Sequence, residues 1–334
     1  MSKKTLFVAI IPLLAISLSG CSSASSPSLD DYVSELDYED GFTILQWTDL
    51  HWSIETDREE EKRYLSAAFE AAKEASPSKR IDLLMITGDL ALISSKSVLE
   101  DEFSFIRSLN VPFGVSWGNH DKQGTYSLSY LDSLASSGQS IYKNVDDDVH
   151  GRSNYVVNIM DGNTVKWQVF SLDSNSYEPS GALYSYDYIH DDQVEWFKEE
   201  SKDVPSLCYF HIPLLEWGDS KNDTTGLKSK EKWEEYEKEC PSPKRSKLFE
   251  EAKKSGVQGM FCGHDHSNDY VSTYEGIVLG YGVKTGKELY YAHSSTRDID
   301  LIGGSLVILH DDSFELKHVY TQDADGYPSY TENY

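Results

Sequence analysis

Basic residues are scarce in this sequence. It contains 30 Lys and Arg against 56 Asp and Glu, which gives a formal net charge of −26 over 334 residues. A surface this acidic repels phosphate backbones and anionic lipids, so the composition argues against a nucleic-acid-binding protein and against membrane adsorption through a basic patch. With 39% hydrophobic and 26% charged residues, the chain is nonetheless typical of a folded globular protein.

Cysteine is also rare, and no Cys-x-x-Cys pair occurs. If the first of the four cysteines, Cys21, is lipidated as argued below, three remain, and an odd number excludes complete internal pairing. Cys208 and Cys262 lie in apolar runs, which predicts buried thiols. A disulfide between these two is the alternative in an exported protein.

The first twenty residues have the pattern of an export signal. Lys3 and Lys4 precede the apolar run Leu6–Leu18, which at thirteen residues is too short to span a bilayer as a helix. A basic start, a short apolar core and a small-residue ending are typical of a signal peptide. The ending Leu18-Ser19-Gly20-Cys21 resembles the lipobox of bacterial lipoproteins, which implies a lipid on Cys21 and display at the outer face of a bacterial membrane. The alternative is an ordinary signal peptide followed by an unmodified cysteine.

Residues 21–40 are expected to form a disordered tether. The stretch is rich in serine and then in aspartate and glutamate, and it has few large apolar side chains with which to bury surface. The folded domain is expected to cover residues 41–322, followed by a C-terminal tail at residues 323–334.

From Gly41 onward, short apolar runs alternate with stretches of helical spacing. The first elements predict parallel βαβ units: strands Phe42–Trp47, Ile81–Thr87 and Val111–Trp117, and helices Arg58–Ala75 and Val98–Leu109. Further strands are expected at Tyr155–Ile159, Val165–Leu172, Ser206–Phe210, Val257–Cys262, Tyr270–Tyr274, Ile277–Tyr281, Leu306–His310 and Glu315–Tyr320, and helices at Asp191–Lys202 and Ser246–Lys254. So many strands exceed one doubly wound sheet and favour an α/β (α+β) protein of two packed sheets with helices outside.

Five of these strands are followed at once by histidine, aspartate or asparagine. The side chains concerned are Asp49 and His51, Asp89, Asn119 with His120 and Asp121, His211, and His264 with His266. The carboxyl ends of strands are where open α/β sheets gather their ligands. Oxygen and nitrogen donors without a thiolate suit first-row divalent or trivalent metals.

The local spacing fits a metal site as well. In Asp-x-His and His-x-His, residues separated by one position in extended backbone point to the same side and can meet one ion or two neighbouring ions. Glycines precede Asp89, Asn119 and His264. They allow the backbone to turn sharply and to approach closely.

In this order, Asp49-x-His51, Gly88-Asp89, Gly118-Asn119-His120-Asp121, His211 and Gly263-His264-Asp265-His266 resemble the calcineurin-like metallophosphoesterase superfamily from about Phe42 to Tyr320. The segments His264–Asp269 and Tyr281–Gly286 resemble purple-acid-phosphatase-like enzymes of the fungal cell-cycle-regulator type. The second motif continues Leu90-Ala91-Leu92 and lacks the tyrosine whose metal-bound form colours purple enzymes. The resemblance therefore points to a non-purple branch.

The resemblance implies a four-layer αββα sandwich of two mixed β-sheets with helices on both outer faces. It also implies two metal ions, Mn, Fe or Zn, bridged by Asp89: Asp49, His51 and His266 would complete one site, and Asn119, His211 and His264 the other. Such a centre hydrolyses phosphate esters by attack of a hydroxide held by the two ions. We expect His120 to act as general acid and transition-state stabiliser, with Asp121 orienting its imidazole.

Several residues receive less weight. Arg152 and Arg297 are candidates for substrate binding, with surface charges as the alternative, and His190, His293, His310 and His318 are expected to be surface or packed residues. A phosphorylated small molecule is the expected partner, with monoesters slightly favoured over diesters. The alternative function is that of a non-catalytic, metal-containing binding lipoprotein at the cell surface.

Overall fold

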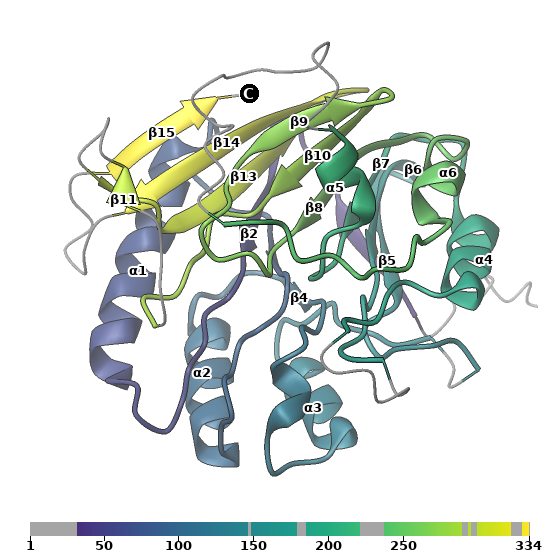
Figure 1. Ribbon diagram of the computed structural model, residues 1–334. Helices are drawn as coiled ribbons and strands as arrows, with labels where there is room; N and C mark the ends of the chain where they lie inside the picture. Colours follow the sequence, from purple (N-terminus) through teal and green to yellow (C-terminus); the bar gives the residue numbers. More distant parts are fainter. Residues whose placement is uncertain are drawn as a thin grey trace, which may run out of the picture. The chain divides into compact units, whose positions relative to one another are not determined.

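Two mixed β-sheets lie face to face in the protein (Figure 1). The computed structural model describes residues 32–145, 148–178, 185–220, 237–288, 293–294, 299–321 and 329–333. In this part of the chain the larger sheet has the order β1-β5-β6-β7-β8-β10-β9, and the smaller sheet has the order β15-β14-β13-β2-β3-β4. A short antiparallel pair, β11 (His293–Ser294) and β12 (Ile299–Asp300), stands apart from both sheets.

The larger sheet carries a parallel block of β6, β7, β8 and β10, and antiparallel pairing joins β6 to β5 and β10 to β9. Its strands are β1 Val33–Asp37, β5 Tyr155–Asp161, β6 Thr164–Ser171, β7 Ser206–Tyr209, β8 Val257–Cys262, β9 Val271–Tyr274 and β10 Ile277–Tyr281. Parallel pairing places the carboxyl ends of β7 and β8 at one edge.

The smaller sheet has a parallel block of β2, β3 and β4, continued by the antiparallel strands β13, β14 and β15. The bounds are β2 Phe42–Trp47, β3 Leu83–Ile86, β4 Phe113–Val115, β13 Gly303–Leu309, β14 Phe314–Thr321 and β15 Ser329–Asn333. The Gln46 side chain connects the two sheets, because its amide donates both to Thr87 Oγ1 after β3 and to the carbonyl of Cys262 in β8.

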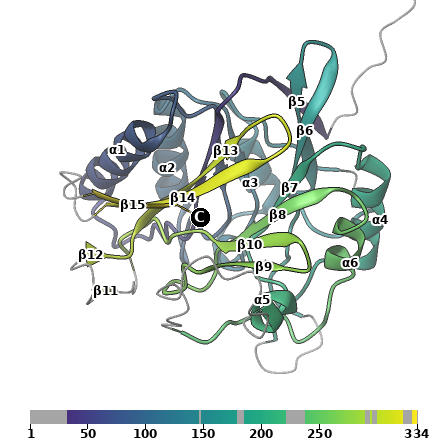
Figure 2. The same ribbon diagram turned by 90° about the horizontal axis from the view of Figure 1, so that it is seen from above.

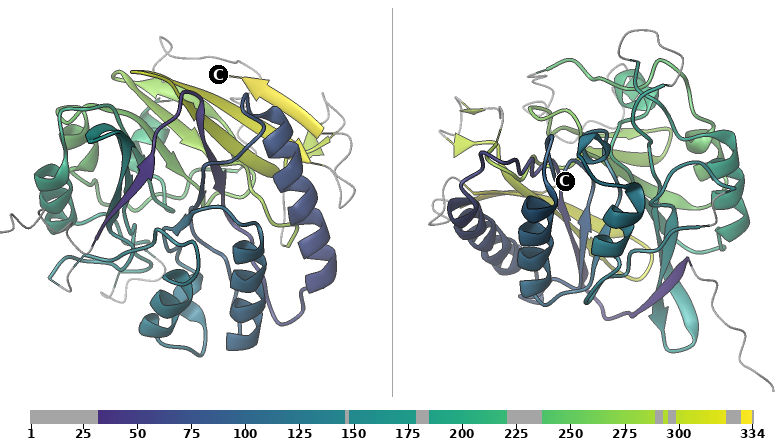
Figure 3. Two further views of the ribbon diagram at one scale, coloured as in Figure 1. Left: turned by 180° about the vertical axis from the view of Figure 1, so that it is seen from behind. Right: turned by 90° about the horizontal axis from the view of Figure 1, so that it is seen from below.

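Helices cover the outer side of each sheet (Figures 2 and 3). Helices α1 (Arg58–Ala75) and α2 (Lys96–Ser108) lie on the smaller sheet with α3 (Leu128–Ala135) beside α2, whereas α4 (Asp191–Glu200) and α6 (Leu248–Ala252) lie on the larger sheet. One buried cluster includes Leu65 of α1, Trp47 of β2 and Tyr209 of β7 and so extends from the outer helix through the smaller sheet to the larger one, and a second packs α4 and α6 against β6, β7 and β8. The predicted sandwich of two mixed sheets with outer helices is confirmed.

Helix α1 shows how closely local sequence determines these elements. The Asp57 carboxylate accepts a hydrogen bond from the N–H of Glu60 and caps the helix, and three acidic residues in the first turn favour its positive end. Leu65, Phe69 and Ala72 are buried at helical spacing. The helix ends at Ala75, before Pro77.

The domain boundaries predicted from the sequence are too narrow at both ends. Strand β1, within the predicted tether 21–40, pairs in parallel with β5, and strand β15, within the predicted tail 323–334, pairs with β14. Both are edge strands, which need apolar side chains on one face only and therefore show a weak sequence signal. The predicted signal peptide, Cys21 and the rest of the tether up to residue 31 lie outside the described residues.

Cys208 and Cys262 are buried free thiols, as expected, so the alternative disulfide between them is not formed. Cys240 is exposed and also free. In the described ranges, none of the helices combines the length and the apolar character that crossing a bilayer requires.

Candidate metal centre

The ends of five strands meet at one place between the two sheets. Strands β2, β3 and β4 of the smaller sheet lead into the first three motifs, and β7 and β8 of the larger sheet lead into the last two. All seven side chains that the sequence predicts as ligands are buried: Asp49, His51, Asp89, Asn119, His211, His264 and His266. Residues more than 200 positions apart in the chain are thereby brought into one cluster.

Asp49, His51, Asp89 and His266 form the first ligand group, with one donor atom from each lying within 4.8 Å of the others. The Oδ2 atom of Asp49 accepts hydrogen bonds from Thr48 Oγ1 at 2.7 Å and from the N–H of His264 at 3.0 Å. Its Oδ1 atom instead faces the Nε2 atoms of His51 and His266, each at 3.4 Å. The carboxylate is therefore fixed through one oxygen and presents the other to the cluster.

Asp89, His211 and His264 form the second ligand group under the same distance limit. His211 Nδ1 donates to the carbonyl of Thr87 at 2.7 Å, which leaves Nε2 with a lone pair in the neutral ring. That nitrogen lies 3.1 Å from Asp89 Oδ2 and 3.2 Å from the amide oxygen of Asn119. The Asn119 nitrogen is turned away and donates to the hydroxyl of Tyr177.

Asp89 belongs to both groups through a single atom. Its Oδ2 lies 3.7 Å from His51 Nε2 in the first group and 3.1 Å from His211 Nε2 in the second. Its Oδ1 accepts the N–H of His120 at 2.8 Å. An oxygen shared between two sets of donors has the geometry of a ligand that bridges two cations.

The backbone around the ligands is unusual. Asp49, His51, Asp89 and His264 have φ values of 54°, 59°, 52° and 78°, in the left-handed region that residues other than glycine rarely occupy. The loops also approach each other closely, since a Cβ on Gly118 would lie 2.2 Å from Asp89 Oδ1 and a Cβ on Gly263 would lie 1.9 Å from Thr48 Oγ1. The expectation that these glycines permit close approach is confirmed. Strain of this kind persists where the surroundings over-determine the backbone, typically at functional sites.

The donor atoms fit metal ions. Asp49 Oδ1, His51 Nε2, Asp89 Oδ2 and His264 Nε2 are buried and make no hydrogen bond within the described residues. Buried polar atoms are normally paired, because leaving them without a partner costs about 1–3 kcal/mol each. A set of inward-facing oxygen and nitrogen lone pairs is stabilised when a cation lies between them. The residues present therefore fit two metal ions of the N/O-preferring type.

The electrostatics of the cluster agree with this assignment. Burial pushes the pKa of Asp89 upward, but the charge of His211, whose Nε2 lies 3.1 Å from Oδ2, and the contact with His51 outweigh it and hold the pKa well below its usual range. Burial and the neighbouring His211 lower the pKa of His264 to about 3. The Asp89 carboxylate raises the pKa of His211 to about 10 against the effect of burial. Ionised carboxylates and a neutral His264 are the forms that bind metals, and His211 is the ring on which a proton competes with the metal.

His120 lies beside the cluster without belonging to it. Its Nε2 atom is 4.0 Å from Asp89 Oδ2, and a quarter of its side chain is exposed to solvent. Its Nδ1 atom lies 2.9 Å from the side-chain oxygen of Gln123, which fixes the ring. Nε2 therefore faces the space next to Asp89.

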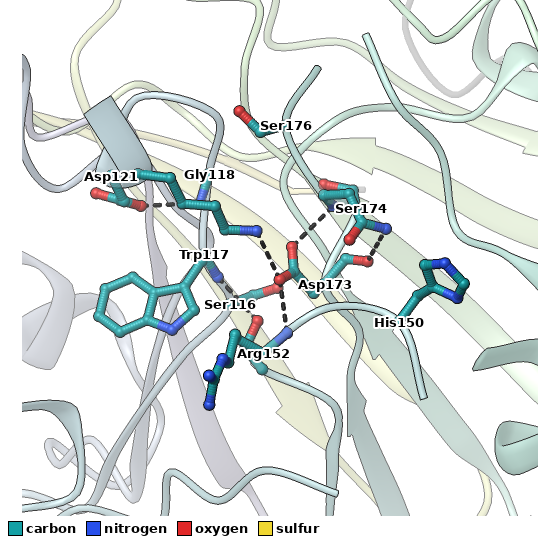
Figure 4. Close-up of polar contacts among 12 residues, drawn as sticks. Ser116, Trp117, Gly118, Asp121, His150, Arg152, Asp173, Ser174 and Ser176 are labelled. Atoms are coloured by element: carbon teal, nitrogen blue, oxygen red, sulfur yellow. Dashed lines mark hydrogen bonds and ion pairs between the residues drawn. The ribbon is translucent and has the colours of Figure 1, made fainter. Parts of the chain in front are cut away.

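The expectation that Asp121 orients the His120 imidazole is wrong. The buried Asp121 carboxylate accepts hydrogen bonds from the backbone N–H groups of Asp89, Ala91 and Gly118, at 2.9, 3.2 and 2.8 Å. Figure 4 shows it beside Gly118. Asp121 thereby holds together the loops after β3 and β4. Gln123, and not Asp121, contacts the His120 imidazole and orients it. Burial and the nearby Asp89 raise the pKa of Asp121 to about 7.

Comparison with known proteins identifies the family. The model of the calcineurin-like phosphoesterases matches residues 42–268, more than half of the chain. The chain belongs to this family. The match covers all the strand-end motifs. The buried cluster of their side chains is the candidate metal centre of this chain.

Two relatives and one solved structure agree with this family assignment. The chain is 27% identical over 277 residues to the phosphatase DCR2 of Saccharomyces cerevisiae, covering 73% of this chain and 48% of the relative. It is 27% identical over 248 residues to the probable inactive purple acid phosphatase 29 of Arabidopsis thaliana, covering 64% of this chain and 61% of the relative. It thus spans about half to three fifths of the length of these two relatives. A dimetal phosphatase from Danio rerio shares the fold with a TM-score of 0.54 and 14% identity, covering 88% of this chain and 99% of that one.

Arg152 lies away from the ligand groups of this calcineurin-like phosphoesterase. Its guanidinium pairs with Asp132 at 3.0 Å. Its backbone N–H donates to Asp173 at 2.7 Å, a contact that Figure 4 shows. It lines a cavity of about 410 Å³ with Lys122 and His150, and no metal ligand lines that cavity. The substrate-binding role stays a prediction. Arg297 lies outside the described residues.

The other histidines behave as expected where their side chains are described. His190 pairs with Asp187, partly exposed His310 pairs with Glu315, and His318 is buried with Nδ1 2.9 Å from Ser305 Oγ. The side chain of His293 lies outside the described residues.

Two neighbours of the centre have no signal in the sequence. The Tyr177 hydroxyl accepts hydrogen bonds from the side-chain amides of Asn119 and Gln123, both at 3.3 Å, and so links a predicted ligand to the residue that fixes His120. The ring of Tyr186 lies edge-on to His264, with 4.4 Å between ring centroids. Both residues lie between β6 and α4, outside every strand-end motif.

Proposed function

We propose that this protein is a metal-dependent phosphoesterase that hydrolyses phosphate esters at the centre around Asp89. The observation that carries the proposal is the position of Asp89 Oδ2, which faces both ligand groups at once. Two cations held this close polarise a phosphoryl group and lower the pKa of a water ligand to about 7, which makes a nucleophile available at neutral pH. They also supply local positive charge within a protein of formal charge −26.

The chain's own residues complete the chemistry. Asp49, His51 and His266 would hold one ion, and Asn119, His211 and His264 the other, with Asp89 between them. His120 would donate a proton from Nε2 to the oxygen of the leaving alcohol and stabilise charge on the phosphoryl group. The hydrogen bond from Nδ1 to Gln123 supports this role, because it directs Nε2 toward the centre.

A second candidate function is that of a metal-containing binding protein without catalysis. The name "probable inactive" given to the plant relative favours it. Against it stands the complete donor set of this chain and the placement of His120, which a purely structural metal site does not require. We therefore favour the enzyme.

The test is metal analysis of the purified protein combined with hydrolysis of para-nitrophenyl phosphate and of bis-para-nitrophenyl phosphate. We expect about two metal ions per chain and turnover that a chelator abolishes. Faster turnover of the first substrate would support the proposed preference for monoesters. A fully metal-loaded protein that hydrolyses neither compound would leave the binding function as the better account.

We also propose that the protein is exported and anchored through a lipid on Cys21. The support is the Leu18-Ser19-Gly20-Cys21 sequence after a short apolar run. Mass spectrometry of the mature N-terminus tests this proposal. A mature chain that begins elsewhere and carries no lipid would contradict it.

A further inference from the structure

The segment Gly282–Gly286, which follows β10, runs from one sheet to the other beside the metal centre. The N–H of Gly282 donates to the carbonyl of Cys262 at the end of β8, at 2.7 Å. Three residues later the N–H of Thr285 donates to the carbonyl of Thr48, just after β2, at 2.9 Å. The segment therefore connects the two strands whose following loops carry the first-group ligands Asp49, His51 and His266.

The contacts fall on the backbone of the loop that carries Asp49 and His51. Thr285 Oγ1 accepts the N–H of Thr48 at 3.0 Å. The Lys284 ammonium donates to the carbonyl of Asp49 at 2.8 Å and to that of Gly286 at 2.6 Å. Gly286 packs so closely that a Cβ there would lie 2.1 Å from the carbonyl oxygen of Leu50. Three successive residues, Thr48 to Leu50, are thus held at their main-chain atoms.

This loop is the part of the centre that most needs such support. Asp49 and His51 both have left-handed φ values and lie on either side of Leu50. Two residues other than glycine in this conformation store strain, so surrounding contacts must hold the turn in place. Lys284 is only 2% exposed, and an ammonium group is buried at such a cost only where its hydrogen bonds are satisfied.

We propose that Lys284 and Thr285 are positioning residues of the metal centre, which hold the strained Thr48–His51 loop so that Asp49 and His51 are set for a metal ion before it binds. The inference rests on the proposed metal-dependent function, but its readout is metal binding and does not depend on turnover.

Charge and geometry make opposite predictions for Lys284. Its ammonium lies near the carboxylates of Asp49 and Asp89, and a cation there repels an incoming metal ion. If charge dominated, removal of the ammonium would tighten metal binding. If the hydrogen bond to Asp49 dominates, as we propose, removal weakens metal binding, because residues that orient ligands typically contribute 10–100-fold to affinity.

The experiment is a calorimetric titration of the metal-free protein with Mn²⁺. We expect Lys284→Met, similar in length but without the donor, to weaken one of two Mn²⁺ sites by roughly 10–100-fold and to leave the other nearly unchanged. Lys287→Met is the matched control: Lys287 lies three residues further on, is partly exposed, and bonds to Glu60 instead of to the ligand loop. Unchanged or tighter Mn²⁺ binding in Lys284→Met would overturn the role of Lys284.

A second pair of variants covers the case in which Lys284→Met does not fold, which near-ultraviolet circular dichroism would reveal. Thr285→Val removes the oxygen that accepts from Thr48, whereas Thr285→Ser retains it. We expect weaker Mn²⁺ binding in the first and near-normal binding in the second. Equal Mn²⁺ affinity in both would overturn the proposal.

A double-mutant comparison identifies which site is affected. His266→Ala disables the first ligand group, so Lys284→Met added to it should weaken the remaining Mn²⁺ site little further. His264→Ala disables the second ligand group. Lys284→Met added to His264→Ala should therefore weaken Mn²⁺ binding at the remaining first group. The reverse pattern would contradict the proposal. A wild-type protein that binds two Mn²⁺ ions and hydrolyses no ester would contradict the proposed activity alone.

Discussion

The carboxylate of Asp89 connects the metal centre to His120. Its Oδ1 atom accepts the backbone N–H of His120 at 2.8 Å, while Oδ2 faces the histidines of both ligand groups. The residue that would bridge the metal ions thus also holds the backbone of the proposed general acid. In the proposed mechanism, metal binding and proton transfer would be linked through the two oxygens of this one side chain.

Asp89→Asn should lose metal and activity together. The amide removes the negative charge that lowers the repulsion between two neighbouring cations, and one of its two acceptor positions becomes a donor. We expect metal content to fall from about two ions to one or fewer, and turnover to fall to background. Elemental analysis and rate measurement on the same preparation check this. Full metal content with full turnover would show that the shared-ligand assignment is wrong.

His120→Ala should separate chemistry from metal binding. Because His120 is not a member of either ligand group, the variant should retain both metal ions. Its rate should fall by roughly 10²–10⁴, the usual contribution of a positioned acid. The loss should be smaller for an aryl phosphate than for an alkyl phosphate, since a nitrophenolate leaves without a proton. His264→Ala is the comparison. It should lose bound metal, and lose activity as a consequence. Release of metal by His120→Ala would contradict the assigned role.

Gln123 should support turnover by holding the His120 ring. Gln123→Leu removes the oxygen that lies 2.9 Å from His120 Nδ1, so kcat should fall while both metal ions are retained. Gln123→Glu keeps an acceptor at the same place and should retain more of the activity. Asp121→Asn, the matched comparison, should change stability or metal content, since Asp121 bonds to backbone N–H groups. A fall in kcat with full metal content in Asp121→Asn, but not in Gln123→Leu, would restore the role first expected of Asp121.

Glu61 should make the protein less stable as the pH rises. Burial raises the pKa of this 4% exposed carboxyl group from 4.5 to about 7. Between those values the unfolded chain has lost the proton and the folded chain retains it, so the free energy of unfolding falls with increasing pH. From pH 5 to pH 8 the loss is ~2 kcal/mol. Urea denaturation of metal-free Glu61→Gln should show this part of the pH dependence removed, whereas Glu59→Gln, on the exposed side of the same turn, should behave as wild type. If the free energy of unfolding of Glu61→Gln fell with pH as steeply as that of the wild type, the prediction would be contradicted.

The ligand positions could be predicted from the sequence because each depends on a local pattern. Asp49, Asp89 and His211 come directly after short apolar strands, and parallel pairing brings such ends together without further information. The contacts of Asp121 could not be predicted, because its partners are backbone N–H groups, two of them in a loop some thirty residues away. Its position next to His120 suggested a side-chain contact that the turn at Asp121–Gln123 directs elsewhere.

Edge strands and supporting residues were hidden for a different reason. Strand β1 is held by a hydrogen-bonded ladder to β5, and a ladder depends on backbone groups that every residue carries. Lys284 has the sequence signature of a surface residue, and only the tertiary structure buries it beneath the Asp49 loop. The Tyr281–Gly286 pattern was visible in the sequence, but the positioning role proposed for Lys284 depends on a contact with a loop more than 230 residues earlier.

Strand β1 limits how far the folded domain can lie from its proposed anchor. Because β1 begins at Val33, about twelve residues separate Cys21 from the sheet, in place of the twenty of the predicted tether. A fully extended chain of that length spans ~40 Å, less than the diameter of many folded domains. With so short a linker, a lipid-anchored protein would lie close to the bilayer surface. Small substrates that diffuse freely near the membrane would reach it more readily than large assemblies further from the bilayer.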